Sequence, residues 1–506
     1  MTGRTLPGLP ARPRTRWVFI VGLVALVSAA CGQKAGVGDP QQTAAAPVLE
    51  AGSPTTVTTG DPAVDVPVDS PGTTAVTGQA VAPSRAQGTP AAQPRSASAA
   101  GLPVQVTRPS GPGSSTTTTA ARGQASKAEP SPVAAPANPR DRIGVTDKEI
   151  VIGVHAPITG AAPVPQDSVE KAKDLYWRFL AERGGIFGRN VRIVFRDDQF
   201  NPSRAVAVCR ELVEQEHVFM LFGIGTDQTT SCARYASQAG VPYFATGGGE
   251  ASVAGLKNFF GISMSLPQQG PMLAQMVKKL GKTKVGVVSI NTPNYDDTFN
   301  SLVQSAKAAG LNVVRADRIS KNPSQSEALA ETNNLRTAGA EAVLIMHAPV
   351  AFLNLAHAAQ GQAYTPLWAG PGLSSGLNLV AEFGCPSIAG ARFLSPFPQL
   401  DVIDRFDANY KPAYRKYNKG EEPDDLGLMV WGLEKTLHQF LQATGPDLTR
   451  SKLMATLESG QEFVSNIFPP LRFGPTRHFG ATQAHLLEAD CNNRRYRTLA
   501  TFASSF

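Results

Sequence analysis

The sequence predicts an α/β protein of two Rossmann-like lobes, each with a parallel-type sheet. Short β-branched runs alternate with amphipathic stretches in two series, one starting near Glu149 and the other at Lys284. Such strand–helix–strand repeats connect through right-handed crossovers, so each series should form a sheet with helices on both faces. Large apolar residues are concentrated after residue 141, and the roughly 366 residues from there onward exceed what one hydrophobic core usually serves.

The first 30 residues are expected to be a signal peptide. Four arginines precede the apolar run 17–30, which is too short to cross a bilayer as a helix. Small residues followed by Cys31 resemble a bacterial lipobox, which predicts lipidation of the Cys31 thiol; cleavage after Ala30 with a free thiol is the alternative. We therefore expect an exported protein that is held by a lipid anchor on the outer face of the cytoplasmic membrane.

Residues 31–140 are expected to be a disordered tether. This stretch is rich in Ala, Pro, Thr and Ser and contains almost no large apolar residues. It cannot bury enough apolar surface to offset the loss of chain entropy on folding. Its expected role is to space the folded part from the membrane.

The first strand–helix series runs to about residue 244. Each expected strand is a short run of β-branched or aromatic residues, and Asn201 followed by Pro202 is a typical helix start. The expected strands are 150–154, 191–195, 218–222 and 241–244, with helices at 166–183, 202–216 and 229–238.

The second series and the C-terminal region follow the same logic. Long apolar periodic stretches predict two further helices before a final pair of strands. The expected strands are 284–290, 311–314, 342–346, 367–369, 391–394, 484–489 and 496–502, with helices at 295–309, 402–417 and 425–443.

Charge and motif content exclude several classes of function. The chain carries 47 basic and 40 acidic residues, but the excess lies mostly in the leader, so the folded part lacks the basic surface that nucleic acid requires. No P-loop and no metal-ligand spacing occur in the sequence, and we expect no cofactor and no metal. A monomer is expected.

Four cysteines remain in the expected folded part, an even number that favours disulfides in an oxidising compartment. Cys209, Cys232, Cys385 and Cys491 allow three connectivities, and buried free thiols are the alternative.

Three segments together resemble a known family. They are Ala156-Pro-Ile-Thr-Gly160, the glycine-rich stretch 184–198 that ends in Asp197-Asp198, and Asn201-Pro-Ser-Arg-Ala-Val-Ala207. The combination resembles the type I periplasmic binding proteins, in particular their leucine/isoleucine/valine-binding branch, over about residues 145–497. The resemblance implies two lobes joined by a three-crossing hinge with a small ligand held between them.

The resemblance also implies lobe boundaries. Lobe 1 would comprise residues 141–262 and 397–478, and lobe 2 residues 263–396 and 479–506. This organisation places Cys209 with Cys232 in one lobe and Cys385 with Cys491 in the other, so these are the expected disulfide pairs.

The ligand site is expected where strands end, at the loops 223–229, 245–249, 291–295, 347–350 and 368–372. Carried over from the family, Thr226, Gly247 and Gly249 would face a ligand carboxylate, with Ala245 starting the same loop. Tyr295 and Trp431 would close over the ligand, and His347 would contact it. Each has an alternative: Thr226 as a helix cap, the glycines as turn residues, Trp431 as a core residue, and His347 as a solvated or core residue.

One departure concerns charge. Gly372 stands where the family places an acidic residue for the ligand's ammonium group, and a buried ammonium without a counter-charge costs on the order of several kcal/mol. A simple branched-chain amino acid is therefore a doubtful ligand, unless Glu250 supplies the charge.

The sequence favours a binding protein over an enzyme. We expect a substrate-binding lipoprotein that captures a small polar metabolite, an amino acid or related amide or carboxylate, for an ABC-type permease. A surface sensor of the same fold is the alternative. A remote alternative is a serine hydrolase, because Gly372–Gly376 matches the G-x-S-x-G pattern with Ser374 at its centre, although the preceding strand is weak.

Overall fold

The computed structural model describes residues 139–506, except residues 161–163, 226 and 373–375. The expected signal peptide and tether, including Cys31, lie outside the described residues, as do Thr226 and Ser374. Within the described part, no helix combines the length and apolar character needed to cross a membrane.

The first lobe is built on a five-stranded sheet whose neighbouring strands all run parallel. A parallel sheet needs helical connections that cover both of its faces, which explains why its central strands are apolar throughout. Across the sheet the strands are β2 (Asn190–Asp197), β1 (Glu149–Ala156), β3 (Met220–Gly223), β4 (Tyr243–Ala245) and β5 (Phe259–Gly261).

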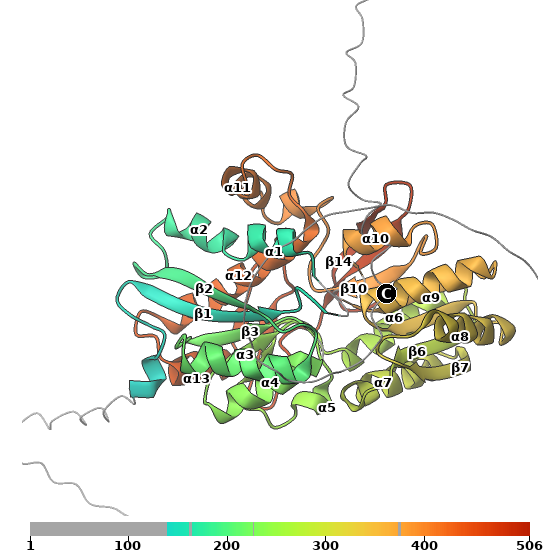
Figure 1. The fold of residues 1–506 in the computed structure, drawn as a ribbon, viewed down its shortest axis with the longest axis horizontal. Coiled ribbons are helices and arrows are strands. Elements are labelled where there is room, and N and C mark those ends of the chain that lie inside the picture. The colour runs from blue at the N-terminus through green and yellow to red at the C-terminus, as the bar shows by residue number, and fades with distance from the viewer. Residues whose placement is uncertain (1–138, 161–163, 226, 373–375) are drawn as a thin grey trace, which may run out of the picture. The chain divides into compact units, whose positions relative to one another are not determined.

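Helices from two separate parts of the chain cover this sheet. The first of them to be predicted in detail, α3 (Pro202–Glu214), begins at the expected N-cap: the Asn201 side chain accepts hydrogen bonds from the backbone N–H groups of Ser203 and Arg204. One face carries α3 and α4 (Asp227–Gln238), and the other carries α1 (Gln166–Ala172), α2 (Leu175–Ala181) and the later helix α12 (Asp425–Thr444) (Figure 1).

Two expected helices are shorter than the sequence suggested. The helix expected over 166–183 is two helices, because Asp174 between them has a non-helical backbone with φ −139°. The helix expected over 402–417 is a short 3-10 turn at Ile403–Arg405 followed by α11 (Tyr410–Tyr417). The prediction of two continuous helices was therefore wrong.

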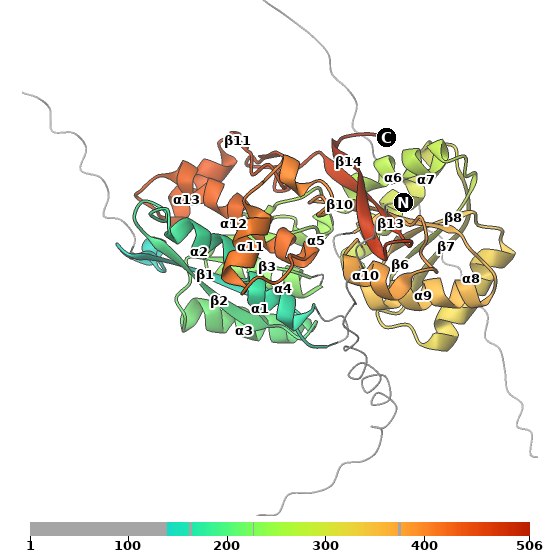
Figure 2. The ribbon, with the colours of Figure 1, turned by 90° about the horizontal axis from the view of Figure 1, so that it is seen from above.

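The second lobe is built on a seven-stranded sheet (Figure 2). Five strands run parallel, but the last two strands of the chain are antiparallel to each other, and β13 is antiparallel to β10. Across the sheet they are β14 (Arg495–Ala503), β13 (Ala484–Asp490), β10 (Arg392–Ser395), β9 (Leu367–Pro371), β8 (Ala342–Met346), β6 (Lys284–Ile290) and β7 (Asn312–Ile319).

Helices cover both faces of this sheet as well (Figure 2). α6 (Gly270–Lys279) and α7 (Asp296–Ala308) pack against each other on one face. The other face carries α8 (Gln325–Thr337), α9 (Pro349–Gly361) and α10 (Asn378–Gly384).

Three chain segments connect the two sheets. They lie between β5 and α6, between β10 and α11, and between the short strand β12 (Leu471–Arg472) and β13. The first and third run side by side, since Gly261 donates a backbone hydrogen bond to His478 and accepts one from Gly480. A Cβ atom at Gly261 would lie 2.3 Å from the ring of Phe479, so the close approach of these two segments requires glycine.

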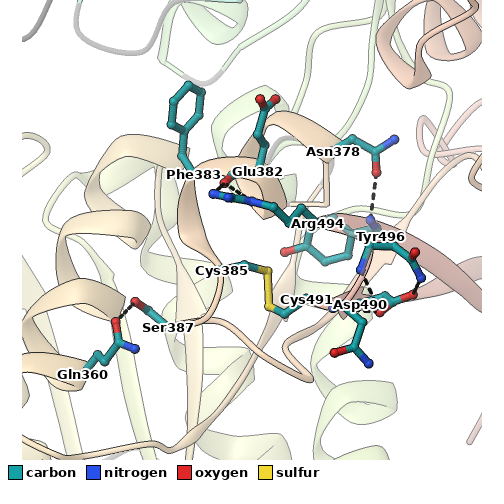
Figure 3. Close-up of a disulfide and its surroundings, with 12 residues drawn as sticks. Gln360, Asn378, Glu382, Phe383, Cys385, Ser387, Asp490, Cys491, Arg494 and Tyr496 are labelled. Atoms are coloured by element: carbon teal, nitrogen blue, oxygen red, sulfur yellow. Dashed lines mark hydrogen bonds between the residues drawn. A yellow bond between two sulfur atoms is a disulfide. The ribbon is translucent and has the colours of Figure 1, made fainter. Parts of the chain in front are cut away.

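Both expected disulfides are present. Cys209–Cys232 joins α3 to α4 in the core of the first lobe, and both cysteines are fully buried. Cys385–Cys491 joins the end of α10 to the turn between β13 and β14 (Figure 3). Around it, the Arg494 guanidinium donates to the carbonyl oxygen of Glu382 and the backbone N–H of Tyr496 donates to Asn378 Oδ1, so the C-terminal strand pair is fastened to α10 at three points.

Candidate ligand cavity between the lobes

A cavity of about 160 Å³ lies where strands of both sheets end. Residues that follow β1, β2, β3 and β4 line it from the first lobe, and residues that follow β6, β8, β9 and β10 line it from the second. The connecting segment after β5 also contributes, between Ser263 and Gln269. The carboxyl ends of parallel strands are the usual place for ligands in open α/β sheets. The lining residues are Pro157, Val164, Pro165, Phe200, Ile224, Gly225, Thr246, Gly247, Gly248, Ser263, Met264, Leu266, Gln269, Tyr295, Met346, His347, Ala348, Pro349, Pro371, Gly372, Leu377, Leu379, Val380, Leu394, Ser395, Pro396, Gln483 and Ala484.

No described lining residue is an aspartate, glutamate, lysine or arginine. The neighbouring residues outside the description, 161–163, 226 and 373–375, are Ala, Pro, Thr, Leu and Ser in the sequence, and none of these side chains is charged. Most of the described lining is aliphatic, aromatic or proline, with a few polar groups among it. Small-molecule sites commonly have this composition, with the polar groups fixing orientation.

Two buried side-chain oxygen atoms in the lining have no hydrogen-bond partner among the described residues. These are the Thr246 hydroxyl and the Gln269 carbonyl oxygen, and both side chains are buried. They come from adjacent segments, because β4 pairs with β5 and the chain beyond β5 returns along the loop after β4. Leaving a buried polar group unpaired costs roughly 1–3 kcal/mol, so these two atoms are the natural partners for a bound molecule.

The Ser263 side chain is hydrogen-bonded to the loop that follows β4. Its hydroxyl accepts a hydrogen bond from the backbone N–H of Gly247 at 2.8 Å and donates to the carbonyl oxygen of Met264 at 3.0 Å. The Gly247 N–H, which the family resemblance offers to a ligand carboxylate, therefore already has a protein partner.

His347 lines the cavity as a neutral ring. Its Nδ1 accepts from the backbone N–H of Ala348 at 3.0 Å, and its Nε2 donates to the carbonyl oxygen of Ser320 at 3.1 Å. Burial lowers the pKa of His347 to about 4. Since both nitrogens have backbone partners, the ring offers its carbon atoms, and no positive charge, to the cavity at neutral pH.

The other sequence-predicted residues are divided between cavity and core. Tyr295 and Gly372 line the cavity, whereas Ala245 is buried inside β4. Gly249 faces the second lobe: a Cβ atom there would lie 2.5 Å from the carbonyl oxygen of Asn294. Glycine is therefore required at position 249 by this close approach, and Gly249 does not line the main cavity.

Trp431 lies in the core of the first lobe and does not line the cavity. Its side chain is fully buried, its ring packs edge-on against Tyr176, and its Nε1 donates to Asp407 Oδ2 at 3.0 Å. The core alternative for this residue is thus the one that the structure supports. Helix α12 is buried on nearly every face, so the periodic pattern alone could not separate a core tryptophan from a ligand contact.

Glu250 does not supply the missing negative charge. Its carboxylate accepts a hydrogen bond from the Ser265 hydroxyl at 2.6 Å, and the residue is exposed and outside the cavity lining.

Polar contacts join the two lobes beside the cavity. Asp227 at the start of α4 accepts from Asn294 Nδ2 at 2.8 Å and lies 3.7 Å from Lys321 Nζ, both on the second lobe. The Lys321 ammonium also lies 3.9 Å from the centre of the Phe200 ring, which lines the cavity. These contacts hold the two lobes together beside the cavity.

One cluster of potential metal ligands occurs among the described residues, made of His155, Cys209 and Cys232. Both sulfur atoms are committed to the disulfide, and the two His155 nitrogens lie 2.7 Å from Asp198 Oδ2 and from the Tyr243 hydroxyl. The cluster is a buried structural network that joins β1, β4 and the end of β2.

Two α/β lobes with a cavity at the strand ends of both sheets define the class of bilobed solute-binding proteins. Residues 149–495 match the family described as periplasmic binding protein, and the chain belongs to that family.

Individual relatives agree with this membership. The chain is 28% identical over 201 residues to the Leu/Ile/Val-binding protein homolog 3 of Brucella melitensis, a match that covers 38% of this chain and 53%, about half, of that protein. A fatty acid ABC transporter substrate-binding protein from Thermomonospora curvata has the same fold, with TM-score 0.61, 19% identity, and coverage of 72% of this chain and 94% of that chain. A branched chain amino acid ABC transporter from Thermus thermophilus with bound valine has TM-score 0.58, 17% identity, and coverage of 71% and 98%.

The hydrolase alternative finds no support in these comparisons, because the relatives reported are named as binding or transport proteins. Ser374 lies outside the described residues. His478, a histidine that follows Ser374 in the chain, has its Nδ1 bonded to the carbonyl oxygen of Phe259 at 2.8 Å in the crossing segment.

Proposed function

We propose that the protein captures a small molecule in the cavity between its lobes and presents it to an ABC-type importer. The observation that carries the proposal is the cavity itself, which is lined by the strand ends of both sheets and flanked by polar contacts between the lobes. A ligand held there stabilises the closed arrangement through contacts that an open arrangement lacks.

In this proposal the lobes comprise residues 141–262 with 397–478 and residues 263–396 with 479–506. The three connecting segments act as the hinge, and Cys31 with the segment 31–140 anchors and spaces the protein at the membrane. The strand membership of the two sheets supports this division. Import is favoured because the matched structures are named for ABC transporters.

The test is ligand-induced thermal stabilisation of the full chain against a panel of amino acids, amides, carboxylates, alcohols and aromatic compounds. A ligand at 100 times its dissociation constant should add roughly 2.7 kcal/mol of stability and raise the melting temperature. A panel without any stabilising compound would contradict the proposal.

A matched pair of variants links any stabilisation to the cavity. Ala348→Trp fills space in the lining, whereas Val350→Trp lies two residues later at a position that is 45% exposed. Stabilisation should be lost in the first variant and kept in the second. A deletion strain complemented with the same two variants, assayed for uptake of the identified compound, tests the importer role.

A further inference from the structure

We infer that the ligand is an uncharged, largely apolar molecule with about six to eight heavy atoms in its apolar part and one hydroxyl or amide hydrogen-bond donor. The inference rests on the proposed function and names the class of molecule that the same cavity accepts.

The first step concerns charge. A charged group taken out of water needs an opposite charge or several hydrogen bonds at its new site. The described lining offers no charged side chain, and two acidic residues on segments beside it have partners within the protein: Asp227 with Asn294 and Lys321, and Glu250 with Ser265. An amino acid would bring an ammonium and a carboxylate into a cavity that neutralises neither.

The second step concerns the groups that could replace a counter-charge. His347 carries no positive charge at neutral pH, and both of its nitrogens already have backbone partners. The Gly247 N–H donates to the Ser263 hydroxyl. The hydrogen-bond donors expected to bind a carboxylate are therefore already bonded to other groups of the protein.

The third step concerns hydrogen bonding. The Gln269 carbonyl oxygen can only accept, and the Thr246 hydroxyl can donate or accept; both are buried, line the cavity and lack a partner among the described residues. A ligand hydroxyl or primary amide donates to Gln269 and can accept from Thr246. A hydrocarbon would leave both atoms unpaired, so the cavity selects for one such polar group.

The fourth step concerns size. The cavity of about 160 Å³ resembles the apolar cavities of about 150 Å³ that accept benzene. A second, smaller cavity of about 30 Å³ lies inside the first lobe and shares Val164 and Ile224 with the main cavity. Both cavities are bounded mainly by apolar side chains, which matches a compact apolar skeleton.

The experiment keeps the skeleton constant and changes only the polar group. Leucine, 4-methylpentanoate, 4-methylpentanamide and 4-methylpentan-1-ol share the same six-carbon branched chain. Calorimetric titration of the full chain at pH 7 should give affinities for the amide and the alcohol at least ten-fold higher than for leucine or the carboxylate.

Variants test the assigned partner. Gln269→Leu should lower the affinity for the alcohol and the amide by about five- to ten-fold, because it removes one hydrogen-bond acceptor. Gln268→Leu, at the exposed neighbouring position, should leave the affinities unchanged. Circular dichroism and the melting temperature of each variant establish that it is folded.

The outcomes separate the two proposals. Binding of leucine or 4-methylpentanoate as tightly as the neutral compounds would overturn the inference while supporting the proposed function. If none of the four compounds binds, the inference fails as stated, even if another compound of the panel does. The absence of binding by every compound in the panel would overturn the proposed function as well.

Discussion

The two lobes share a parallel βα design, but the chain completes them in different ways. The sheet of the first lobe is finished within one continuous stretch, from β1 to β5, and its disulfide joins cysteines 23 residues apart. The sheet of the second lobe receives β13 and β14 from the end of the chain, and its disulfide joins cysteines 106 residues apart. The difference teaches that the second lobe depends more heavily on long-range closure, and the variants below test that dependence.

The largest effect is expected from removing the long-range disulfide. Cys385→Ser with Cys491→Ser should lower the free energy of unfolding by about 5 kcal/mol, because the chain entropy released in the unfolded state grows with loop length. Urea denaturation measures the loss, and hydrogen exchange should show β13 and β14 opening first. A loss below about 1 kcal/mol would show that the hydrogen bonds at Glu382 and Asn378 suffice to hold the strand pair.

Removing the short-range disulfide should cost less. Cys209→Ser with Cys232→Ser is expected to lower the free energy of unfolding by about 3 kcal/mol, since the loop that it closes is shorter. The same denaturation protocol measures it, and the increased exchange should stay near α3 and α4. If this pair costs more than the long-range pair, loop closure does not explain the contrast between the lobes.

Buried titratable groups contrast the lobes in a second way. His485 on β13 is fully buried, and burial lowers its pKa to about 4. The neutral form is favoured in the folded state, so its contribution to stability is present above the unfolded pKa near 6.5 and is lost as the pH falls toward 4. The loss amounts to about 3 kcal/mol at most, at roughly 1.4 kcal/mol for each pKa unit.

Urea denaturation of wild type and His485→Gln between pH 7 and pH 4 checks this dependence, which should be weaker in the variant. Glu434 in the first lobe should have the opposite effect on the pH dependence of stability. Burial raises the pKa of its carboxyl group, so its contribution to the free energy of unfolding is lost as the pH rises. Glu434→Gln therefore serves as the control: it removes a loss of stability that begins as the pH rises above the unfolded pKa near 4.5, so stability should rise more steeply from pH 4 to pH 7 than in wild type. Equal flattening of the acidic side by both variants would contradict the assignment.

The smallest effect is expected at the contact between the lobes. Asp227→Asn weakens the attraction to Lys321 and should destabilise the closed arrangement by about 1 kcal/mol, a value typical of partly exposed pairs. Ligand dissociation measured by stopped flow should become about five-fold faster. Asp296→Asn, which disrupts an ion pair with Arg318 inside the second lobe, is the matched control and should not change dissociation.

Much of this architecture could be predicted from the sequence. Runs such as 284–290 and 342–346 coincide with strands β6 and β8. A short β-branched stretch between two amphipathic helical patterns is too short for a helix and is typical of a buried parallel strand. The predicted ligand loops also contribute to the cavity, at Gly225, Gly247, Tyr295, His347 and Gly372. Strand ends are located by the pattern itself, and this suffices to find the edge of the sheet at which a cavity forms.

The remaining features depend on contacts that no local pattern carries. Gln269 and Leu377 reach the cavity from segments without a motif, and Trp431 has the same helical spacing whether it faces core or ligand. The antiparallel strand β13 pairs with β10 across at least 90 residues of sequence, as in Ser395 with His485. Buried hydrogen bonds such as that of Ser263 with Gly247 decide which polar groups remain for a ligand, and they exist only in the assembled fold.

The strand pair at the end of the chain has a consequence for biosynthesis. A polypeptide emerges from the ribosome, or from a translocation channel, with its N-terminus first, whereas the second lobe needs β13, β14 and Cys491 from its last residues. That lobe cannot close until the chain has emerged as far as β14. Its sheet edge at β10 stays open for pairing until then, so the cavity, which Ala484 of β13 helps to line, forms only after these late strands are available.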